Sequence, residues 1–158
     1  MNYEKLYSTY LKSTGVSTDT RAIGSGNIFF ALKGPSFNGN TFAEQALKEG
    51  AMAVVIDEPV MTASPEVFLV ENVLESLQEL ARIHRSNIDA KVIGLTGSNG
   101  KTTAKELFRS VLATSYRVHA TPGNLNNHIG MPITILNTPK ETEILIVEMG
   151  ANHQGEIR

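Results

Sequence analysis

The hydrophobic positions of this chain follow two periods in alternation. Apolar residues recur at helical spacing from Tyr3 to Ser13 and from Val73 to Ile88, which predicts amphipathic helices in both segments. Short apolar runs bounded by glycine, proline or polar residues predict strands elsewhere, and those over 28–33 and 92–97 are expected to be buried. These runs are Ile28 to Lys33, Ala53 to Ile56, Val67 to Val70, Val92 to Gly97, Arg117 to Thr121 and Glu143 to Met149.

Further helices are predicted between these strands. Thr41 and Glu44 have the spacing of a capping box at the start of a helix that runs to Lys48. Another helix is predicted over 101–112, and a short one begins near Ile129. Strands that alternate with helices predict an α/β fold with a mainly parallel sheet. A polar stretch over 86–91 predicts two parts, a small α/β domain over residues 1–88 and the start of a second over 89–158.

Composition and charge exclude several classes of protein. The chain has 158 residues, 14 Lys and Arg against 16 Asp and Glu, and no Cys. The lack of Cys excludes disulfides, thiol catalysis and iron–sulfur centres, and the scattered positive residues argue against nucleic-acid binding. No run approaches the ~18 apolar residues of a membrane span, and the N-terminus lacks a secretory signal. We therefore expect a cytoplasmic protein that does not insert into a membrane.

The strongest chemical motif is the segment T-G-S-N-G-K-T-T between a predicted strand and a predicted helix. Exposed backbone N–H groups and the helix N-terminus predict a site for phosphate oxygens. We expect Lys101 to reach the β- and γ-phosphates of ATP and the Thr102 hydroxyl to hold Mg²⁺. The first glycine of the general P-loop pattern would fall at Leu95, so an ordinary strand–helix turn with an exposed lysine is the alternative. The predicted nucleotide-binding residues are Thr96, Gly97, Ser98, Asn99, Gly100, Lys101, Thr102 and Thr103.

A carboxylate is expected beside this loop. Glu148 lies at the end of the apolar segment E-I-L-I-V-E-M, which predicts a strand. The carboxyl end of a neighbouring parallel strand faces the phosphate site, where such a residue binds Mg²⁺. A solvated glutamate at a strand end is the alternative.

Longer motifs resemble the Mur ligase family. They are S-T-D-T-R over 17–21, F-F-A-L-K-G with F-N-G-N over 29–43, T-G-S-N-G-K-T-T over 96–103, T-P-G-N-L-N-N-H-I-G-M-P over 121–132 and E-M-G-A-N-H-Q-G-E-I over 148–157. Within the family, the resemblance is to the branch that adds D-alanyl-D-alanine to UDP-MurNAc-tripeptide, using ATP and Mg²⁺ and an acyl-phosphate intermediate. It implies catalytic roles for Lys101 and Glu148, and a metal site formed by Thr102 and Glu148.

The resemblance also implies residues that contact the UDP-linked substrate. They are Thr18, Thr20, Arg21, Ser36, Asn38, Gly39, Asn124 and Asn127. Structural alternatives stay open for all of them: a polar strand end for the first three, a plain turn for the next three, and capping of the following helix for the asparagines. The sequence leaves the roles of Asn126 and His153 open, and it does not identify the third residue of the tripeptide.

Two alternative functions remain at this stage. One is a related ATP-dependent amide ligase with another carboxylate acceptor, and the other is a non-catalytic P-loop nucleotide-binding module. No N-K-x-D segment occurs, so a GTPase switch is not indicated. A strand ends near residue 148 with no closing helix after it, so we expect a piece of a longer protein. We expect this piece to be monomeric and to bind substrate without full catalysis.

Overall fold

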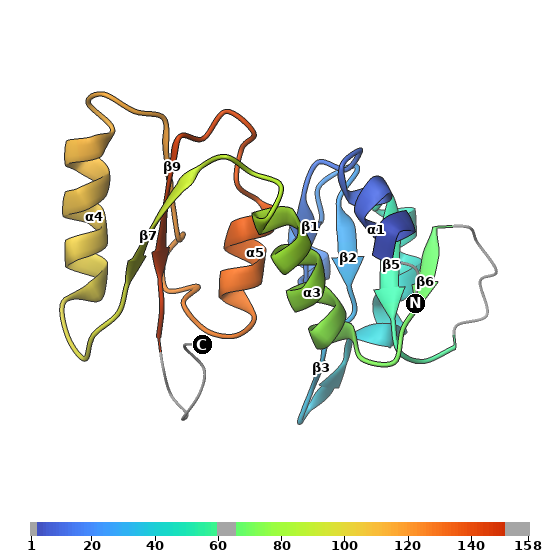
Figure 1. Cartoon of the computed structure of the whole chain (residues 1–158). Helices are drawn as coiled ribbons and strands as arrows, with labels where there is room; N and C mark the ends of the chain where they lie inside the picture. Colours follow the sequence, from blue (N-terminus) through green and yellow to red (C-terminus); the bar gives the residue numbers. More distant parts are fainter. Residues whose placement is uncertain (1–2, 60–65, 151–158) are drawn as a thin grey trace. The chain divides into compact units, whose positions relative to one another are not determined.

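The computed structural model describes residues 3–59 and 66–150. The chain divides into two compact units, Met1–Ile83 and His84–Arg158 (Figure 1). Each unit contains its own sheet, and every strand pairing in the two larger sheets is parallel. The predicted α/β fold with mainly parallel sheets is confirmed.

The first unit is built on a four-stranded sheet in the order β1-β2-β5-β6. Its strands are β1 (Val16–Ser17), β2 (Ile28–Phe30), β5 (Ala53–Ile56) and β6 (Val67–Leu69). The two central strands, β2 and β5, are buried along their whole length. Parallel strands covered on both faces have this continuous apolar character, because neither face meets water.

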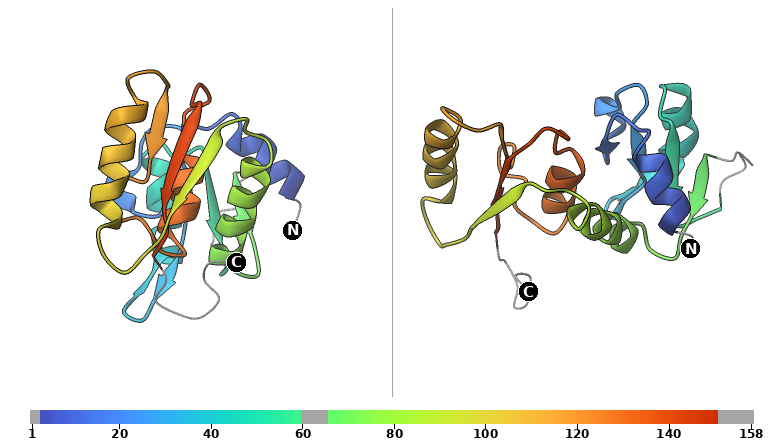
Figure 2. Two further views of the ribbon diagram at one scale, coloured as in Figure 1. Left: turned by 60° about the vertical axis from the view of Figure 1, so that its left-hand side comes forward. Right: turned by 45° about the horizontal axis from the view of Figure 1, so that its top comes forward.

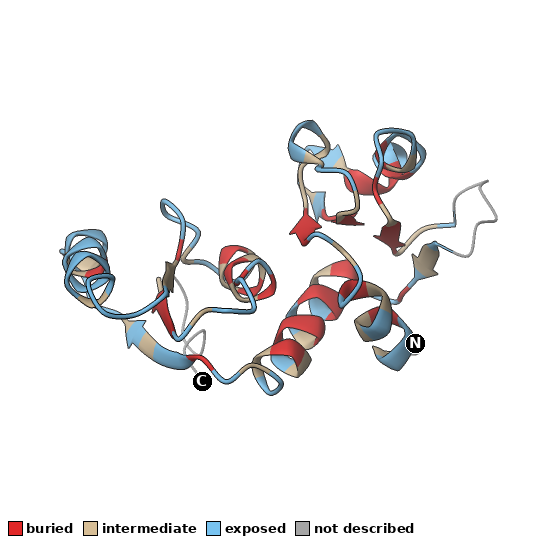
Figure 3. Cartoon of the chain, turned by 90° about the horizontal axis from the view of Figure 1, so that it is seen from above, coloured by how far each residue is buried: buried red, intermediate tan, exposed pale blue. Residues whose placement is uncertain are grey.

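Helices cover both faces of this sheet. They are α1 (Tyr3–Tyr10), α2 (Ala43–Lys48) and α3 (Val73–Arg85). Figure 3 shows α2 on one side of the strands and α1 and α3 on the other, and Figure 2 gives further views. On the α2 side, Phe29 and Val54 pack with Ala43 and Ala46 in one apolar cluster. The predicted helix over 73–88 is present and ends at Arg85.

The segment between β2 and α2 differs from the prediction. The predicted strand over 28–33 ends at Phe30, and a small antiparallel hairpin follows, formed by β3 (Lys33–Gly34) and β4 (Phe37–Asn38). Short 3₁₀ helices lie over Thr20–Ala22 (η1) and Gly39–Phe42 (η2). The predicted capping box is wrong, because Asn38 accepts from Asn40 N and caps η2 instead. Phe42 precedes α2 without a side-chain cap, and the Thr41 hydroxyl donates to Asn38 O.

The second unit is built on a three-stranded parallel sheet in the order β7-β9-β8. Its strands are β7 (Lys91–Leu95), β8 (Val118–Ala120) and β9 (Ile144–Glu148). Helices α4 (Lys101–Leu112) and α5 (Gly130–Leu136) lie on opposite faces (Figure 1). The central strand β9 is buried throughout. The core includes Leu145 and Val147, against which Met131 and Ile135 pack.

The expectation of a buried strand over 92–97 is wrong in its burial. The strand runs over Lys91–Leu95, and its residues are exposed or half-buried. Among the described residues it pairs with β9 alone. An apolar run indicates a strand but does not indicate how far its residues are buried. Within residues 3–59 and 66–150, no helix combines the length and apolar character needed to cross a bilayer.

Candidate functional site

A five-residue loop joins β7 to α4 and leaves the helix N-terminus open. The loop is exposed over 96–100. Gly97 and Gly100 have φ angles of 148° and 76°, which residues other than glycine rarely adopt. Gly100 precedes the helix without any side-chain cap, so the first N–H groups of α4 face outward. This backbone can receive a phosphate group.

Lys101 folds back over this loop. Its ammonium group donates a hydrogen bond to the carbonyl oxygen of Gly97 at 2.7 Å. The contact spans the loop from end to end and places a positive charge within it. A phosphate in the loop would take the place of the Gly97 carbonyl as the partner of Lys101, since a charge-assisted bond to an anion is the stronger one.

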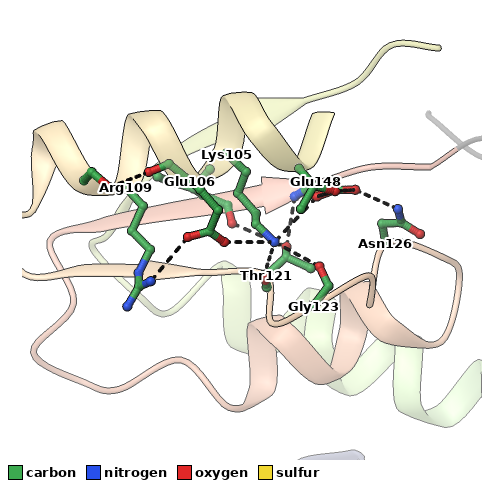
Figure 4. A network of polar contacts seen from close by, with 10 residues as sticks. Lys105, Glu106, Arg109, Thr121, Gly123, Asn126 and Glu148 are labelled. Atoms are coloured by element: carbon green, nitrogen blue, oxygen red, sulfur yellow. Dashed lines mark hydrogen bonds and ion pairs between the residues drawn. The ribbon is translucent and has the colours of Figure 1, made fainter. Parts of the chain in front are cut away.

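Glu148 lies beside the loop at the end of the central strand. The register pairs it with Leu95, the last residue of β7. Its side chain is almost completely buried, with a residue exposure of 1%. The Thr102 hydroxyl lies 3.2 Å and 3.0 Å from the two carboxylate oxygens. Asn126 donates to one of these oxygens at 2.8 Å (Figure 4). The structure therefore brings the predicted loop and the predicted carboxylate together.

Lys105 also enters this network, and the sequence analysis did not identify it. It is 1% exposed, and its ammonium group lies 3.6 Å from a Glu148 carboxylate oxygen. The same group donates to the carbonyl oxygens of Thr121 at 2.8 Å and Gly123 at 2.9 Å. Its position four residues after Lys101 is a usable signal, because residues i and i+4 share one face of a helix.

The three asparagines after β8 have different surroundings. Asn127 accepts from the backbone N–H groups of Ile129 and Gly130, at 3.1 Å and 2.7 Å, and so caps the start of α5. Asn126, whose role the sequence left open, contacts Glu148. Asn124 is exposed, and its backbone carbonyl oxygen accepts from the backbone N–H of Asn126 at 2.7 Å. Asn126 is thus the member of this group that reaches the carboxylate. His153 lies outside the described residues.

The residues around Glu148 fit a Mg²⁺ ion. Mg²⁺ prefers oxygen ligands and commonly binds one or two carboxylates together with substrate phosphates and water. Glu148 is a buried carboxylate beside the Thr102 hydroxyl and a phosphate-accepting loop, which supplies that set of ligands. No cluster of three or more His, Asp or Glu suited to a metal occurs in the described part of the chain. Phosphate oxygens and water would therefore complete the coordination of the ion.

A second candidate site lies in the first unit. A cavity of about 570 Å³ is lined by Thr18, Asp19, Thr20, Arg21, Phe29, Phe37, Gly39, Phe42 and Gln45. Phe37 and Phe42 are exposed by 55% and 40%, which is unusual for large aromatic side chains. Four residues predicted to bind substrate therefore share one cavity, namely Thr18, Thr20, Arg21 and Gly39. The aromatic rings were not predicted, because their exposure depends on the β3–β4 hairpin.

Arg21 is held in place at this cavity by Asp19. The guanidinium group makes two hydrogen bonds to the Asp19 carboxylate, at 2.9 Å and 2.7 Å. These bonds, together with one from the Arg21 backbone N–H, lower the pKa of Asp19 to about 2. The pair is exposed, so its net effect on stability is small. The pair directs the Arg21 guanidinium toward Asp19, at the rim of the cavity.

Ser36 and Asn38 were predicted with this group but do not line the cavity. Asn38 caps η2, and its amide donates to Glu58 at 2.8 Å. Asn40, which is 4% exposed, also bonds to Asn38 and to Asp57, each at 2.8 Å. These contacts tie the β3–β4 hairpin to the end of β5. The side chain of Asn38 is therefore engaged within the protein.

These features define an α/β protein with a phosphate loop and an adjoining carboxylate. Residues 12–94 match the family described as "Mur ligase family, catalytic domain", and residues 95–158 match the "Mur ligase middle domain". The chain belongs to the Mur ligase family.

Several relatives are similar over most of this chain. A UDP-N-acetylmuramoyl-tripeptide–D-alanyl-D-alanine ligase of Bacillus subtilis is 49% identical over 146 residues, which are 90% of this chain and 32% of the relative. The ligase of the same name from Escherichia coli is 42% identical, over 90% of this chain and 31% of the relative. The chain thus spans about a third of the length of these relatives.

Solved structures agree with this assignment. The MurF ligase of Thermotoga maritima, solved in complex with ADP, is 38% identical and superposes with a TM-score of 0.82. The match covers 94% of this chain and 34% of that one. MurF from Acinetobacter baumannii is also 38% identical, with a TM-score of 0.80 over 90% of this chain and 31% of that structure.

Proposed function

We propose that this chain is part of an ATP-dependent ligase that adds D-alanyl-D-alanine to UDP-MurNAc-tripeptide. The observation that carries the proposal is the contact of Thr102 with Glu148 at the mouth of the phosphate loop. The relatives that carry the name of this activity, at 49% and 42% identity, support the choice of substrates. The T. maritima structure in complex with ADP supports the choice of nucleotide.

The two units have separate tasks in this proposal. Residues 1–88 form a domain that binds the UDP part of the substrate in the cavity lined by Arg21 and Phe37. The guanidinium group suits a diphosphate, and an exposed aromatic ring suits the face of a base. Residues 89–158 begin the domain that binds ATP, with contacts from the loop residues 96–103. Asn124 and Asn127 stay candidates for substrate contact through atoms that do not cap α5.

The first chemical step is transfer of a phosphoryl group. A carboxylate oxygen of the tripeptide attacks the γ-phosphorus of ATP, a new O–P bond forms, and the bond to the β-phosphate breaks. Lys101 and the N–H groups at the start of α4 neutralise the charge that spreads over the phosphate oxygens. Thr102 and Glu148 would hold Mg²⁺, which supplies further neutralisation when it is bound. The products of this step are ADP and an acyl phosphate.

The second step forms the amide. The amine of D-alanyl-D-alanine attacks the acyl carbon, a C–N bond forms, the C–O bond breaks and phosphate leaves, while the amine loses a proton. This chain spans about a third of its relatives, so the proposal assigns the amine site and full catalysis to the whole protein. The proposal also includes a monomeric protein that acts in the cytoplasm, where ATP is supplied.

The experiment that tests this proposal uses the full-length protein. It is incubated with UDP-MurNAc-tripeptide, D-alanyl-D-alanine, ATP and Mg²⁺, and phosphate release and product mass are followed. We expect release that needs all four components and a product heavier by one dipeptide less one water. Release with a different carboxylate acceptor, and none with this one, would favour the related-ligase alternative. ADP binding without release for any acceptor would favour a nucleotide-binding module.

A further inference from the structure

Lys105 carries a positive charge inside the second unit and has no part in the two steps above. Figure 4 shows its side chain reaching from α4 toward the turn after β8 and the end of β9. Its ammonium group has three hydrogens to donate. Two of the hydrogen bonds go to the carbonyl oxygens of Thr121 and Gly123, at 2.8 Å and 2.9 Å. Lys105 thus fixes this turn to the helix that begins at the phosphate loop.

The remaining side of the ammonium group faces two carboxylates. Glu148 lies at 3.6 Å and Glu106 at 3.4 Å, and Glu106 also pairs with Arg109 at 3.4 Å. The two negative charges of Glu106 and Glu148 are therefore matched by the two positive charges of Lys105 and Arg109. A buried ammonium ion is strongly unfavourable unless its charge is paired and its donors are bonded. Here two donors are hydrogen-bonded and two carboxylates lie within 3.6 Å. The match indicates a built arrangement rather than a lysine buried by chance.

Lys105 acts on Glu148 by two routes. The direct route is the ion pair, which gives this buried carboxylate a neighbouring positive charge. The indirect route runs through the turn that Lys105 holds. In that turn the Thr121 hydroxyl accepts from the backbone N–H of Glu148 at 2.9 Å, and Asn126 donates to its carboxylate at 2.8 Å. Both routes hold the carboxylate in the orientation in which it meets Thr102.

We propose that Lys105 is a positioning residue for the metal-binding carboxylate. It fixes Glu148 and the turn over 121–126 against α4 before nucleotide and Mg²⁺ arrive, and it touches no reacting atom itself. This inference rests on the proposed function only in that Glu148 and Thr102 hold Mg²⁺ beside a bound nucleotide. It does not depend on which carboxylate accepts the phosphoryl group.

The test compares Lys105→Met with Lys91→Met in the full-length protein. Both changes remove one lysine charge from the same unit, but Lys91 is exposed at the start of β7. ADP binding is measured by calorimetry with EDTA and then with Mg²⁺. We expect Lys105→Met to bind ADP within about threefold of wild type in EDTA, and to lose about tenfold or more of the strengthening that Mg²⁺ gives, since loss of a group that orients a metal ligand typically costs 10–100-fold. Lys91→Met should match wild type in both conditions.

A kinetic measurement adds a second readout. In the ligation assay, Lys105→Met should raise the Mg²⁺ concentration for half-maximal velocity by about tenfold, in line with that loss of metal affinity. The KM for the UDP-linked substrate should stay unchanged. A wrong acceptor would abolish this assay for every variant but leave the calorimetric difference intact, so the two proposals fail in different ways.

A folded Lys105→Met protein with the same gain in ADP affinity from Mg²⁺ as wild type would overturn the inference. If this variant does not fold, amine labelling of the wild-type protein in EDTA decides. We expect Lys105 to be protected while Lys91 reacts, because the network forms without nucleotide or metal. Equal labelling rates at the two lysines would show that the network is not formed in advance, and would overturn the inference as well.

Discussion

The hydroxyl oxygen of Thr102 lies 3.0 Å and 3.2 Å from the two carboxylate oxygens of Glu148, although 46 positions separate the residues in the chain. The parallel pairing of β7 with β9 produces this contact, because Leu95 and Glu148 are register partners at the carboxyl ends of the two strands. The strand that leads into the phosphate loop and the strand that carries the carboxylate therefore end side by side. The contact joins two motifs that the sequence presents separately.

The first prediction concerns this carboxylate. In Glu148→Gln an amide replaces one oxygen and removes the negative charge that would hold Mg²⁺. We expect kcat for ATP-dependent ligation to fall by about 100-fold or more, which is the usual scale for losing one preorganised electrostatic group. Phosphate release under saturating substrates measures the change. The matched control is Glu143→Gln, an exposed glutamate just before the same strand, which should keep activity close to that of wild type.

The second prediction concerns Lys101. Lys101→Ala removes the ammonium group that lies across the loop on Gly97 O. We expect loss of ATP turnover by about 100-fold or more, since a charge that neutralises phosphate oxygens in the transition state is absent. Binding of the UDP-linked substrate, measured by calorimetry, should stay within about twofold, because its proposed site lies in the first unit. A parallel loss of both would show that Lys101 supports the fold rather than the phosphate site.

The sequence predicted the local elements well, because the two periodicities depend on neighbouring residues. The helix predicted over 101–112 coincides with α4, and the strand predicted at 53–56 coincides with β5. Contacts between segments that are distant in the sequence were harder to predict. Asn126 reaches Glu148 only through the strand register and the turn after β8, which no local pattern encodes. For Lys105 the local sign is its spacing of four residues from Lys101, and that spacing does not identify Glu148 as its partner.

The errors of prediction have similar causes. The capping box predicted at Thr41 does not form, because the side chain of Asn38, three residues earlier, accepts from the backbone N–H of Asn40 and starts a 3₁₀ helix. The strand over 92–97 was expected to be buried, but its residues are exposed or half-buried, because among the described residues it has a neighbouring strand on one side only. Both outcomes depend on contacts between segments, which the local pattern of residues does not contain.

The third prediction concerns the cavity in the first unit. Arg21→Ala and Phe37→Ala each remove a group that lines it without disturbing the buried sheet. We expect each to raise the KM for the UDP-linked substrate by about tenfold with little change in kcat, the pattern of an interaction that binds ground state and transition state alike. Steady-state kinetics with that substrate varied, at saturating ATP, measures this. A fall in kcat with no change in KM would contradict the proposed binding role.

The fourth prediction concerns pH and His119. Burial, and then the positive charge of Arg109, lower the pKa of this imidazole from its ordinary value. Within the described part of the chain its Nε2 is buried without a hydrogen-bond partner. A base with a lower pKa in the folded state takes up a proton more readily when unfolded. Its contribution to stability is therefore full above the unfolded pKa of about 6.5 and is lost as pH falls toward the folded pKa.

Thermal unfolding at pH 7.5 and pH 5.5 tests this expectation. Wild type should lose stability between the two values, and His119→Gln, which cannot titrate, should lose measurably less. His128→Gln makes the same change at an exposed histidine and should lose as much as wild type. If His119→Gln and wild type show the same loss, the protonation of His119 does not govern this part of the pH dependence.

The fifth prediction separates structure from binding at Gly39. The resemblance places this glycine among the substrate residues, and it does line the cavity. A Cβ atom here would lie 2.4 Å from Leu32 O and 2.6 Å from Ala31 C, and neither backbone atom can move freely next to the buried strand β2. The hydrogen bond from Gly39 N to Leu32 O, at 2.9 Å, fixes the same approach. A side chain is therefore excluded for a reason of packing alone.

We accordingly expect Gly39→Ala to destabilise the first unit by about 1–3 kcal/mol, the usual cost of an added group that forces a backbone shift. Chemical denaturation measures the loss. Gly24→Ala is the matched control, because the atoms nearest to its Cβ belong to the side chain of Asn27, at 3.2 Å, and not to the backbone. If Gly39→Ala retains wild-type stability but binds the UDP-linked substrate more weakly, the glycine is required by the ligand. If stability falls and binding recovers at lower temperature, where the unit is folded, the requirement lies in the close approach of the backbone.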